Sequence, residues 1–188
     1  AVARGRILAE SLVSTVTVPP LDNSAMDGYA VRCADITQAG AELPVSQRIP
    51  AGSVGHTLAS GTAARIFTGA PVPAGADAVV MQEFCEHGKT GGVIVNQVPK
   101  LGQNIRRAGE DIAAGAEVLP AGKRLGPAEI GLAASIGFAQ VPVRRHLRVA
   151  LLSTGDELTE PGHPLPPGGI YNSNRHFLRA MFEACHEA

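Results

Sequence analysis

The sequence predicts a multidomain α/β protein in which a mostly β domain of short strands precedes the beginning of an α/β unit. The first observation is composition, because 45% of the 188 residues are hydrophobic and can form a core, while 22 Gly and 14 Pro indicate many short elements joined by turns. The second is a series of short apolar segments in residues 43–98, each bounded by Gly, Pro or Asp, as in a compact β domain. The third is a longer apolar stretch at residues 147–158, which leads into a polar loop and a helix.

The charges and the cysteines exclude several classes of function. Lys and Arg number 16 against 17 Asp and Glu, so no basic surplus is available to bind nucleic acid. Cys33, Cys85 and Cys185 are odd in number and far apart, which indicates reduced thiols rather than a disulfide framework or a zinc ribbon. No apolar run has the length of a membrane span, and the first residues do not resemble a signal peptide. We therefore expect a cytoplasmic protein with no nucleic-acid or membrane partner.

The first half of the chain is expected to form short strands. Residues 6–18 are apolar and β-branched, and part of them is predicted to be a strand. Residues 28–36 alternate between inward and outward positions, which predicts another strand. Further strands are predicted within residues 44–49, 62–69, 77–84 and 91–98.

The chain then becomes turn-rich, in residues 101–122, before one clear helix is predicted at residues 126–138. Pro127 suits the first turn of this helix, and Gly137 is a natural stop. A short strand is predicted at residues 140–145.

The last segment has the pattern of an α/β unit. Residues 147–158 predict a continuous apolar strand that runs into a polar loop, and a Pro/Gly-rich link separates them from a helix within residues 170–188 that Asn172 or Ser173 can cap. One strand and one helix do not make a stable sheet, so we expect the rest of this domain to be missing. The helix face predicted to be buried consists of Phe177, Leu178, Met181, Phe182 and Cys185.

Four clusters of polar side chains are candidates for chemistry. Taken singly, each has an ordinary explanation, because acids in Gly-containing turns usually cap the backbone or face water, and a pair of arginines is usually solvated. Only the fourth cluster has a positional argument, since ligands of open α/β sheets bind beyond the carboxyl ends of the strands. The clusters are Asp22, Asn23, Ser24 and Asp27; Thr68, Gly69 and Glu83; Asn104, Arg106, Arg107, Glu110 and Asp111; and Ser153, Thr154, Gly155, Asp156 and Glu157.

Taken together, the clusters indicate one kind of chemistry. Carboxylates and hydroxyls are ligands suited to Mg²⁺, and no spacing of His and Cys fits zinc. The arginines and the amides of the turns could hold the remaining oxygens of an anion. The residues therefore predict a metal-assisted reaction of a phosphate or another oxyanion, with no motif for a Ser/His/Asp triad or a P-loop.

Four segments of the chain resemble the MoeA-type molybdopterin molybdenumtransferases, a group to which the C-terminal domain of gephyrin belongs. The resemblance covers essentially the whole chain, in the same order and at similar spacing. The segments are DNSAMDGYAVR at residues 22–32, TGAPVPAGADAVVMQE at residues 68–83, GQNIRRAGED at residues 102–111 and VALLSTGDEL at residues 149–158.

The resemblance implies a specific architecture. An elongated linker domain I would take residues 1–13 and 116–146, with the mostly β domain II, residues 14–115, inserted in it. Residues 147–188 would begin a molybdopterin-binding α/β domain III, which we expect to be truncated in this chain. Members of the family are elongated homodimers, and their active cleft lies between domain III of one subunit and the β-rich domain of the other.

The resemblance also implies a reaction and its residues. The family joins molybdate to the dithiolene of adenylylated molybdopterin and releases AMP with a divalent cation, for which we expect Mg²⁺. The partners would be these small molecules and a molybdopterin adenylyltransferase, and Asp22 would organise the turn. The catalytic residues would be Asp27, Thr68, Asp111 and Glu157, of which Asp27, Asp111 and Glu157 would bind the metal, while Arg106, Arg107, Thr154, Gly155, Asp156 and Asn174 would contact the cofactor.

Some features of the family have no counterpart in the chain. These are a GGxSxG motif followed by an acid, the lysines that grip the cofactor, a fourth domain and an N-terminal helix, and Leu21 stands where an aromatic residue is common. We therefore expect a fragment that carries half of each cleft and does not turn over alone. A non-catalytic dimerisation or scaffold module of the gephyrin type is the main alternative, and a molybdate-binding or sensing module is a third. The choice between molybdenum and tungsten stays open.

Overall fold

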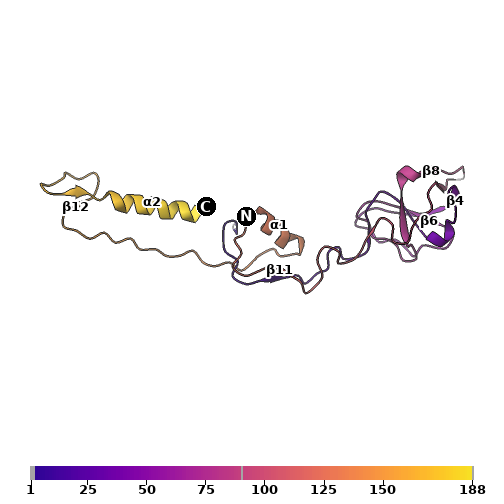
Figure 1. The fold of residues 1–188 in the computed structure, drawn as a ribbon, viewed down its shortest axis with the longest axis horizontal. Helices are drawn as coiled ribbons and strands as arrows, with labels where there is room; N and C mark the ends of the chain where they lie inside the picture. Colours follow the sequence, from indigo (N-terminus) through magenta and orange to yellow (C-terminus); the bar gives the residue numbers. More distant parts are fainter. Residues whose placement is uncertain (1–2, 90, 188) are drawn as a thin grey trace. The chain divides into compact units, whose positions relative to one another are not determined.

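The computed structural model describes residues 3–89 and 91–187, and it divides into two compact units. Unit 2 is Val13–Val118, and unit 1 consists of the residues up to Leu12 together with those from Leu119 onward. The chain passes between the units at strands β1 (Leu12–Val13) and β11 (Glu117–Leu119), which pair in a two-stranded sheet (Figure 1). The mixture of strands and helices agrees with the predicted α/β class.

The larger sheet of unit 2 is four-stranded, in the order β5-β6-β3-β7. Strand β5 (Val45–Ile49) is parallel to β6 (Ala63–Ile66), and β3 (Gly28–Val31) is antiparallel to both β6 and β7 (Ala78–Met81). Apolar cores cover both faces, which is why buried residues follow one another along these strands. One core includes Val31, Ile36, Ala78 and Val80, and the other includes Ala30, Ile49, Ile66 and Val79.

A three-stranded antiparallel sheet packs against the first of these cores. Its central strand is β9 (Val93–Val95), which pairs with β4 (Ala41–Leu43) and β8 (Cys85–His87). Leu43, Val93 and Val95 enter the same core as Val31. The predicted strands within residues 44–49, 62–69, 77–84 and 91–98 are thus confirmed as β5, β6, β7 and β9.

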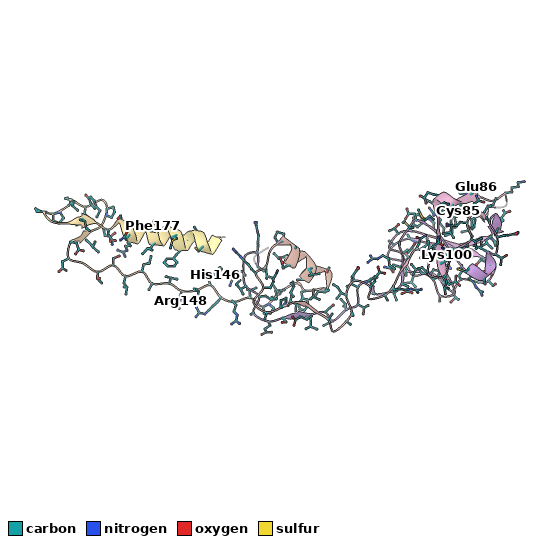
Figure 2. All side chains as sticks on the ribbon, in the orientation of Figure 1. Cys85, Glu86, Lys100, His146, Arg148 and Phe177 are labelled. Atoms are coloured by element: carbon teal, nitrogen blue, oxygen red, sulfur yellow. The ribbon has the colours of Figure 1, made fainter. Side chains whose placement is uncertain are left out.

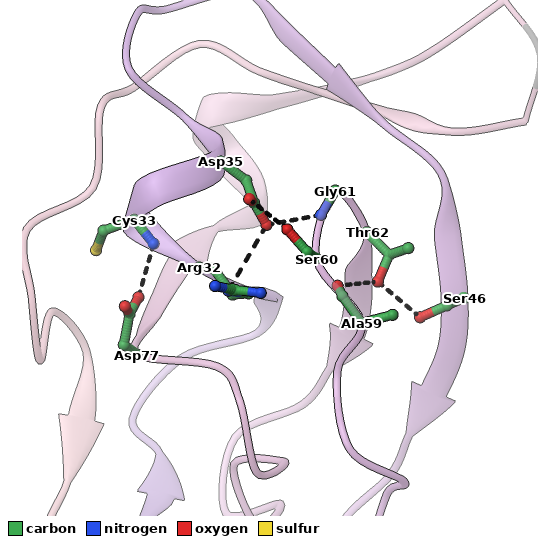
Figure 3. A network of polar contacts seen from close by, with 9 residues as sticks. All are labelled: Arg32, Cys33, Asp35, Ser46, Ala59, Ser60, Gly61, Thr62 and Asp77. Carbon is green, nitrogen blue, oxygen red and sulfur yellow. Dashed lines mark hydrogen bonds and ion pairs between the residues drawn. The ribbon is translucent and has the colours of Figure 1, made fainter.

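Two predicted strands are shorter than expected. The strand predicted at residues 28–36 ends at Val31 and is followed by the 3-10 helix η1 (Cys33–Asp35), and β7 is followed by η2 (Gln82–Phe84). The carboxylate of Asp35 explains the first turn, because it accepts hydrogen bonds from the Ser60 hydroxyl (3.1 Å) and the Gly61 N–H (2.8 Å) and so ties η1 to the loop before β6 (Figure 3).

The cysteines are all free. Burial raises the pKa of the Cys33 thiol to about 11, with a further contribution from Asp77, and burial also raises the pKa of Cys85 to about 11. Asp77 accepts a hydrogen bond from the Cys33 N–H at 2.7 Å (Figure 3). Because both thiols are protonated at neutral pH, they act as small apolar residues at the edge of the core.

In unit 1 the predicted helix is confirmed as α1 (Pro127–Ser135). The Gly126 N–H donates to the Glu129 carboxylate at 2.9 Å, which satisfies one of the free donors at the helix start. Gly137 has a φ of 89°, so the helix ends where the sequence predicts. The strand predicted at residues 140–145 is wrong except for a single bridge, in which Val143 pairs with the buried Leu8.

The strand predicted at residues 147–158 is also wrong, since the strand β12 covers only Leu158–Thr159, where it pairs in parallel with β13 (Ile170–Tyr171). The side chains of Leu147 and Leu152 are 77% and 91% exposed. Figure 2 shows His146 and Arg148 on an extended stretch of chain without secondary structure. An apolar strand of this kind is stable only between neighbouring strands, and no described strand pairs with residues 147–157.

The final helix is α2 (Ser173–Glu187), and its predicted cap is confirmed, because Asn172 Oδ1 accepts a hydrogen bond from the Arg175 N–H at 3.2 Å. The predicted buried face is wrong in this chain. Phe177 (labelled in Figure 2) is 66% exposed and Met181 is 45% exposed, because no described element covers them. Neither of the helices in the described ranges combines the length and the apolar character that crossing a membrane requires.

Candidate active site

Three loops of unit 2 that are far apart in the sequence are joined by backbone hydrogen bonds. We call them the opening loop (residues 22–27), the Thr68 loop (residues 68–72) and the arginine loop (residues 104–111). The short strand β2 (Asn23–Ser24) in the opening loop pairs with β10 (Ile105–Arg106) in the arginine loop.

The opening loop is equally well connected to the Thr68 loop. The Gly69 N–H donates to the Ser24 carbonyl and the Ser24 N–H donates to the Ala70 carbonyl, both at 2.9 Å. The Val72 N–H donates to the Asp22 carbonyl at 2.8 Å. The first three clusters predicted from the sequence therefore lie together, apart from Glu83, which lies in η2, and the opening loop is bonded to each of the other two.

Asp27 and Thr68 form the closest pair of candidate catalytic residues. Asp27 directly precedes β3 and Thr68 follows β6, and these strands are antiparallel with Gly28 opposite Ile66, so both residues lie at the same end of the sheet. Asp27 Oδ1 accepts hydrogen bonds from the Thr68 N–H at 2.8 Å and from the Thr68 hydroxyl at 2.7 Å. These two bonds, with a smaller contribution from the charge of Arg65, hold the pKa of Asp27 below its ordinary value.

Gly28, the residue after Asp27, is required by the packing of the sheet. A Cβ at this position would lie 2.0 Å from the Val80 carbonyl oxygen on β7. A side chain there would push β3 away from its neighbour and move Asp27 with it. The close approach of β3 and β7 therefore fixes the position of the Asp27 backbone, from which the carboxylate extends.

Asp22 connects the opening loop to the arginine loop. Its carboxylate accepts a hydrogen bond from the Ala108 N–H at 2.8 Å and forms an ion pair with Arg107 Nη1 at 2.6 Å. These two contacts lower the pKa of Asp22, with the Ala108 hydrogen bond as the larger cause. The carboxylate of Asp22 thus joins the opening loop to the arginine loop and engages the guanidinium of Arg107.

Asp111 and Arg106 form a second pair within the arginine loop. Arg106 Nη2 donates to Asp111 Oδ1 at 2.6 Å, and this bond raises the pKa of Arg106. Glu110 also lies near Arg106, at 3.7 Å. Asp111 is in turn held by its backbone N–H, which donates to the Val18 carbonyl at 3.0 Å.

The fourth cluster lies in unit 1 and is exposed. Gly155 has a φ of 146°, and a Cβ there would lie 2.6 Å from both carboxylate oxygens of Glu157, so this turn favours glycine. Thr154 and Asp156 are exposed beside them. Asn174 is the second residue of α2 and is exposed. These positions belong to unit 1, whereas the three loops belong to unit 2.

Two of the three predicted metal ligands, Asp27 and Asp111, lie in unit 2 and offer suitable chemistry. Oδ1 of both Asp27 and Asp111 is occupied by hydrogen bonds, whereas their Oδ2 atoms have no hydrogen-bond partner in the described ranges. Such carboxylate oxygens are ligands of the kind that Mg²⁺ prefers. In the part of the chain that is described, however, no group of three or more His, Cys, Asp or Glu residues is arranged to hold a metal ion.

Two structurally central residues were missed by the sequence reasoning. Arg65, on β6, donates to the Gly28 carbonyl at 2.9 Å and to Gln82 Oε1 at 2.6 Å. Glu160 binds the side chains of Asn172 and Arg175 and so supports the start of α2. The only signal for Arg65 was a charged residue inside an otherwise apolar strand, next to the TGAP segment.

Comparison with known proteins gives consistent results. A family model described as "MoeA N-terminal region (domain I and II)" matches residues 1–137. A protein of Haemophilus influenzae named molybdopterin molybdenumtransferase is 45% identical over 185 residues, which cover 98% of this chain and 46% of that protein. Molybdopterin molybdenumtransferase 2 of Mycobacterium tuberculosis is 48% identical over 183 residues, which cover 95% of this chain and 45% of that protein.

A solved structure agrees with these relatives. The crystal structure of the molybdopterin biosynthesis MoeA protein from Pyrococcus horikoshii matches with a TM-score of 0.85 and 36% identity. The match covers 98% of this chain and 48% of that protein. The chain thus spans about half the length of the relatives it matches.

Proposed function

The chain belongs to the MoeA family, and on this premise we propose that it forms part of a molybdopterin molybdenumtransferase that acts in molybdenum cofactor biosynthesis. The proposed reaction joins molybdate to the dithiolene of adenylylated molybdopterin and releases AMP. The names of the curated relatives support the reaction class. The observation that carries the proposal is the pairing of Asp27 with Thr68, because it places two of the family's motifs, MDG and TGAP, in direct contact.

Both substrates in this reaction are anions, so the protein must supply positively charged groups that bind them. The arginine loop supplies two guanidinium groups, and each is held by an acid at 2.6 Å, Arg106 by Asp111 and Arg107 by Asp22. Held in this way, the guanidinium groups keep further N–H donors for oxyanions, since each carries five. We assign cofactor contacts to Arg106 and Arg107, and further contacts to Thr154, Gly155, Asp156 and Asn174.

We propose Mg²⁺ as the cation, held by Asp27, Asp111 and Glu157 of the partner subunit. When bound, it would offset the negative charge of the acids and of the substrate oxygens and polarise the phosphoryl group. The Oδ2 atoms of Asp27 and Asp111, which have no hydrogen-bond partner among the described residues, support their assignment. Family resemblance, not a contact within the chain, supports the assignment of Glu157. A site shared in this way implies a homodimer.

Three further assignments rest on the same premise. A chain that spans about half of its relatives is proposed to lack turnover alone, because only part of the site lies in it. A molybdopterin adenylyltransferase is the proposed supplier of the substrate. A cytoplasmic location is proposed from the free cysteines.

The experiment that tests the function measures AMP release. It uses a protein that contains this chain and has the length of the curated relatives, which we call the parent-length protein. With molybdate, Mg²⁺ and adenylylated molybdopterin, the parent-length protein should release AMP, and its Asp27→Asn variant should fold but release none. The 188-residue chain should also release none. Wild-type turnover by Asp27→Asn would contradict the proposal.

A further inference from the structure

Arg65 lies on one face of the four-stranded sheet, in a row of side chains that reaches the Asp27–Thr68 pair. The strand register places Arg48 on β5 beside Arg65 on β6, and Arg65 opposite Tyr29 on β3. The guanidinium of Arg65 lies over the ring of Tyr29 at 5.1 Å and over the ring of Phe67 at 4.7 Å. Arg48 also lies over Phe67, at 4.5 Å. Cation–π contacts on two rings fix the orientation of Arg65, which is half-buried.

The donors of Arg65 bind the backbone directly after Asp27 and the side chain of Gln82. Arg65 Nη1 donates to the carbonyl of Gly28, the residue after Asp27, at 2.9 Å. Arg65 Nη2 donates to the side chain of Gln82 at 2.6 Å, and the Gln82 N–H in turn donates to the Asp27 carbonyl at 3.0 Å. The guanidinium of Arg65 therefore holds the carbonyl of Gly28 directly. It holds the carbonyl of Asp27 indirectly, through Gln82.

The other partner of the pair is also within reach of Arg65. Phe67, on which Arg65 stacks, directly precedes Thr68, whose N–H and hydroxyl bind Asp27. Arg65 thus contacts Gly28, the neighbour of Asp27, and Phe67, the neighbour of Thr68. It makes no hydrogen bond to the side chain of Asp27 or Thr68 among the described residues. A planar fork of donors is needed for this arrangement, and a lysine at the same position could not reproduce it.

From this geometry we propose that Arg65 is a positioning residue, which acts through Gly28, Gln82 and Phe67 to hold the Asp27 carboxylate against Thr68. The inference deepens the proposed function and rests on it for its catalytic consequence, but the positioning itself can be measured without turnover. The effect of Arg65 on Asp27 is then one of orientation as well as of charge.

Amide hydrogen exchange of the 188-residue chain tests the positioning. In Arg65→Met the amides of Thr68 and Gln82 should exchange about tenfold faster, as expected for the loss of about one hydrogen bond. The amides of Ala30 and Ala64, which lie in the paired strands, should be unchanged. Arg65→Lys keeps the charge but should behave like Arg65→Met. Arg48→Met is the matched control, since it removes a guanidinium that also stacks on Phe67 but does not make the hydrogen bonds of Arg65 to Gly28 and Gln82, and it should leave Gln82 unchanged.

Three outcomes would overturn the inference. Unchanged exchange of Thr68 and Gln82 in Arg65→Met would show that Arg65 does not hold the pair. Equal acceleration throughout the sheet would reduce Arg65 to a stabiliser of the fold. Full protection in Arg65→Lys would show that charge alone is sufficient.

A kinetic measurement in the parent-length protein separates this inference from the proposed function. Arg65→Met should lower kcat about tenfold or more with an unchanged KM, because a misplaced group costs rate rather than substrate affinity. A loss of kcat/KM of the same size that came from a raised KM, with kcat unchanged, would overturn the positioning role. If Asp27→Asn keeps wild-type turnover, the proposed function fails, while the exchange experiment still decides whether Arg65 positions Asp27.

Discussion

The hydroxyl and the backbone N–H of Thr68 both donate to the same oxygen of Asp27, at 2.7 and 2.8 Å. These residues are 41 positions apart in the sequence. A carboxylate held from one side in this way keeps its second oxygen available, and its orientation is fixed before any ligand arrives. The pair is therefore the part of unit 2 most suited to chemistry.

The first prediction concerns the hydroxyl of this pair. Thr68→Val keeps the shape and the backbone donor but removes one of the two hydrogen bonds to Asp27. Stability should fall by no more than about 1 kcal/mol, whereas AMP release by the parent-length protein should fall strongly. Thr68→Ser is the matched control and should retain most activity. Equal activity of the Val and Ser variants would contradict a role for the hydroxyl.

The second prediction concerns pH and Asp22. Because hydrogen bonds from Ala108 and Arg107 lower the pKa of Asp22 below 3.8 in the folded state, the charged carboxylate favours folding at all pH values above about 4. This contribution disappears as the pH falls through the lowered pKa. In urea denaturation, Asp22→Asn should be less stable than the wild type at pH 7, and the difference should shrink towards pH 2. A difference that stays constant over this range would refute the assignment.

A third prediction tests the close approach of two strands. Gly28→Ala should destabilise unit 2 by about 2 kcal/mol or more, since the added carbon would lie 2.0 Å from the Val80 oxygen. Gly131→Ala provides the contrast, because Gly131 lies in α1 with no atom near the added carbon. That variant should be more stable by about 0.5–1 kcal/mol. Thermal unfolding of both measures the difference, and a neutral Gly28→Ala would contradict the strand register.

The fourth prediction concerns the start of α2. Asn172→Ala removes the acceptor for the Arg175 N–H and should cost about 1 kcal/mol of helix stability. Ser173→Ala, one residue further on, has no such bond and should be neutral. Helix content by circular dichroism during thermal unfolding compares the two, and equal effects would show that Asn172 is not the cap.

Much of the fold could be predicted because its signals are local. Pro127 and Gly137 bound α1, and Gly, Pro or Asp bounds the apolar segments of residues 43–98. Residues 147–158 show the limit of such signals, since an apolar run becomes a strand only where neighbouring strands pair with it.

The candidate site could be predicted only in part. The residue types in residues 22–27 and 104–111 indicated anion and metal chemistry, but the contacts between loops depend on strand register over long separations, as between Asp22 and Arg107. Arg65 was missed for the same reason, because its role depends on which residues its strand places opposite it. Family resemblance supplied the roles of individual residues, which composition and spacing alone left open.

The central claim is that Asp27 of one subunit and Glu157 of the partner subunit serve one site, and complementation tests it most directly. In the parent-length protein, Asp27→Asn and Glu157→Ala should each abolish AMP release. Dimers assembled from an equal mixture of the two variants should recover about a quarter of the wild-type activity, because half of them contain one intact site of two. Mixed dimers no more active than either variant alone would contradict the claim.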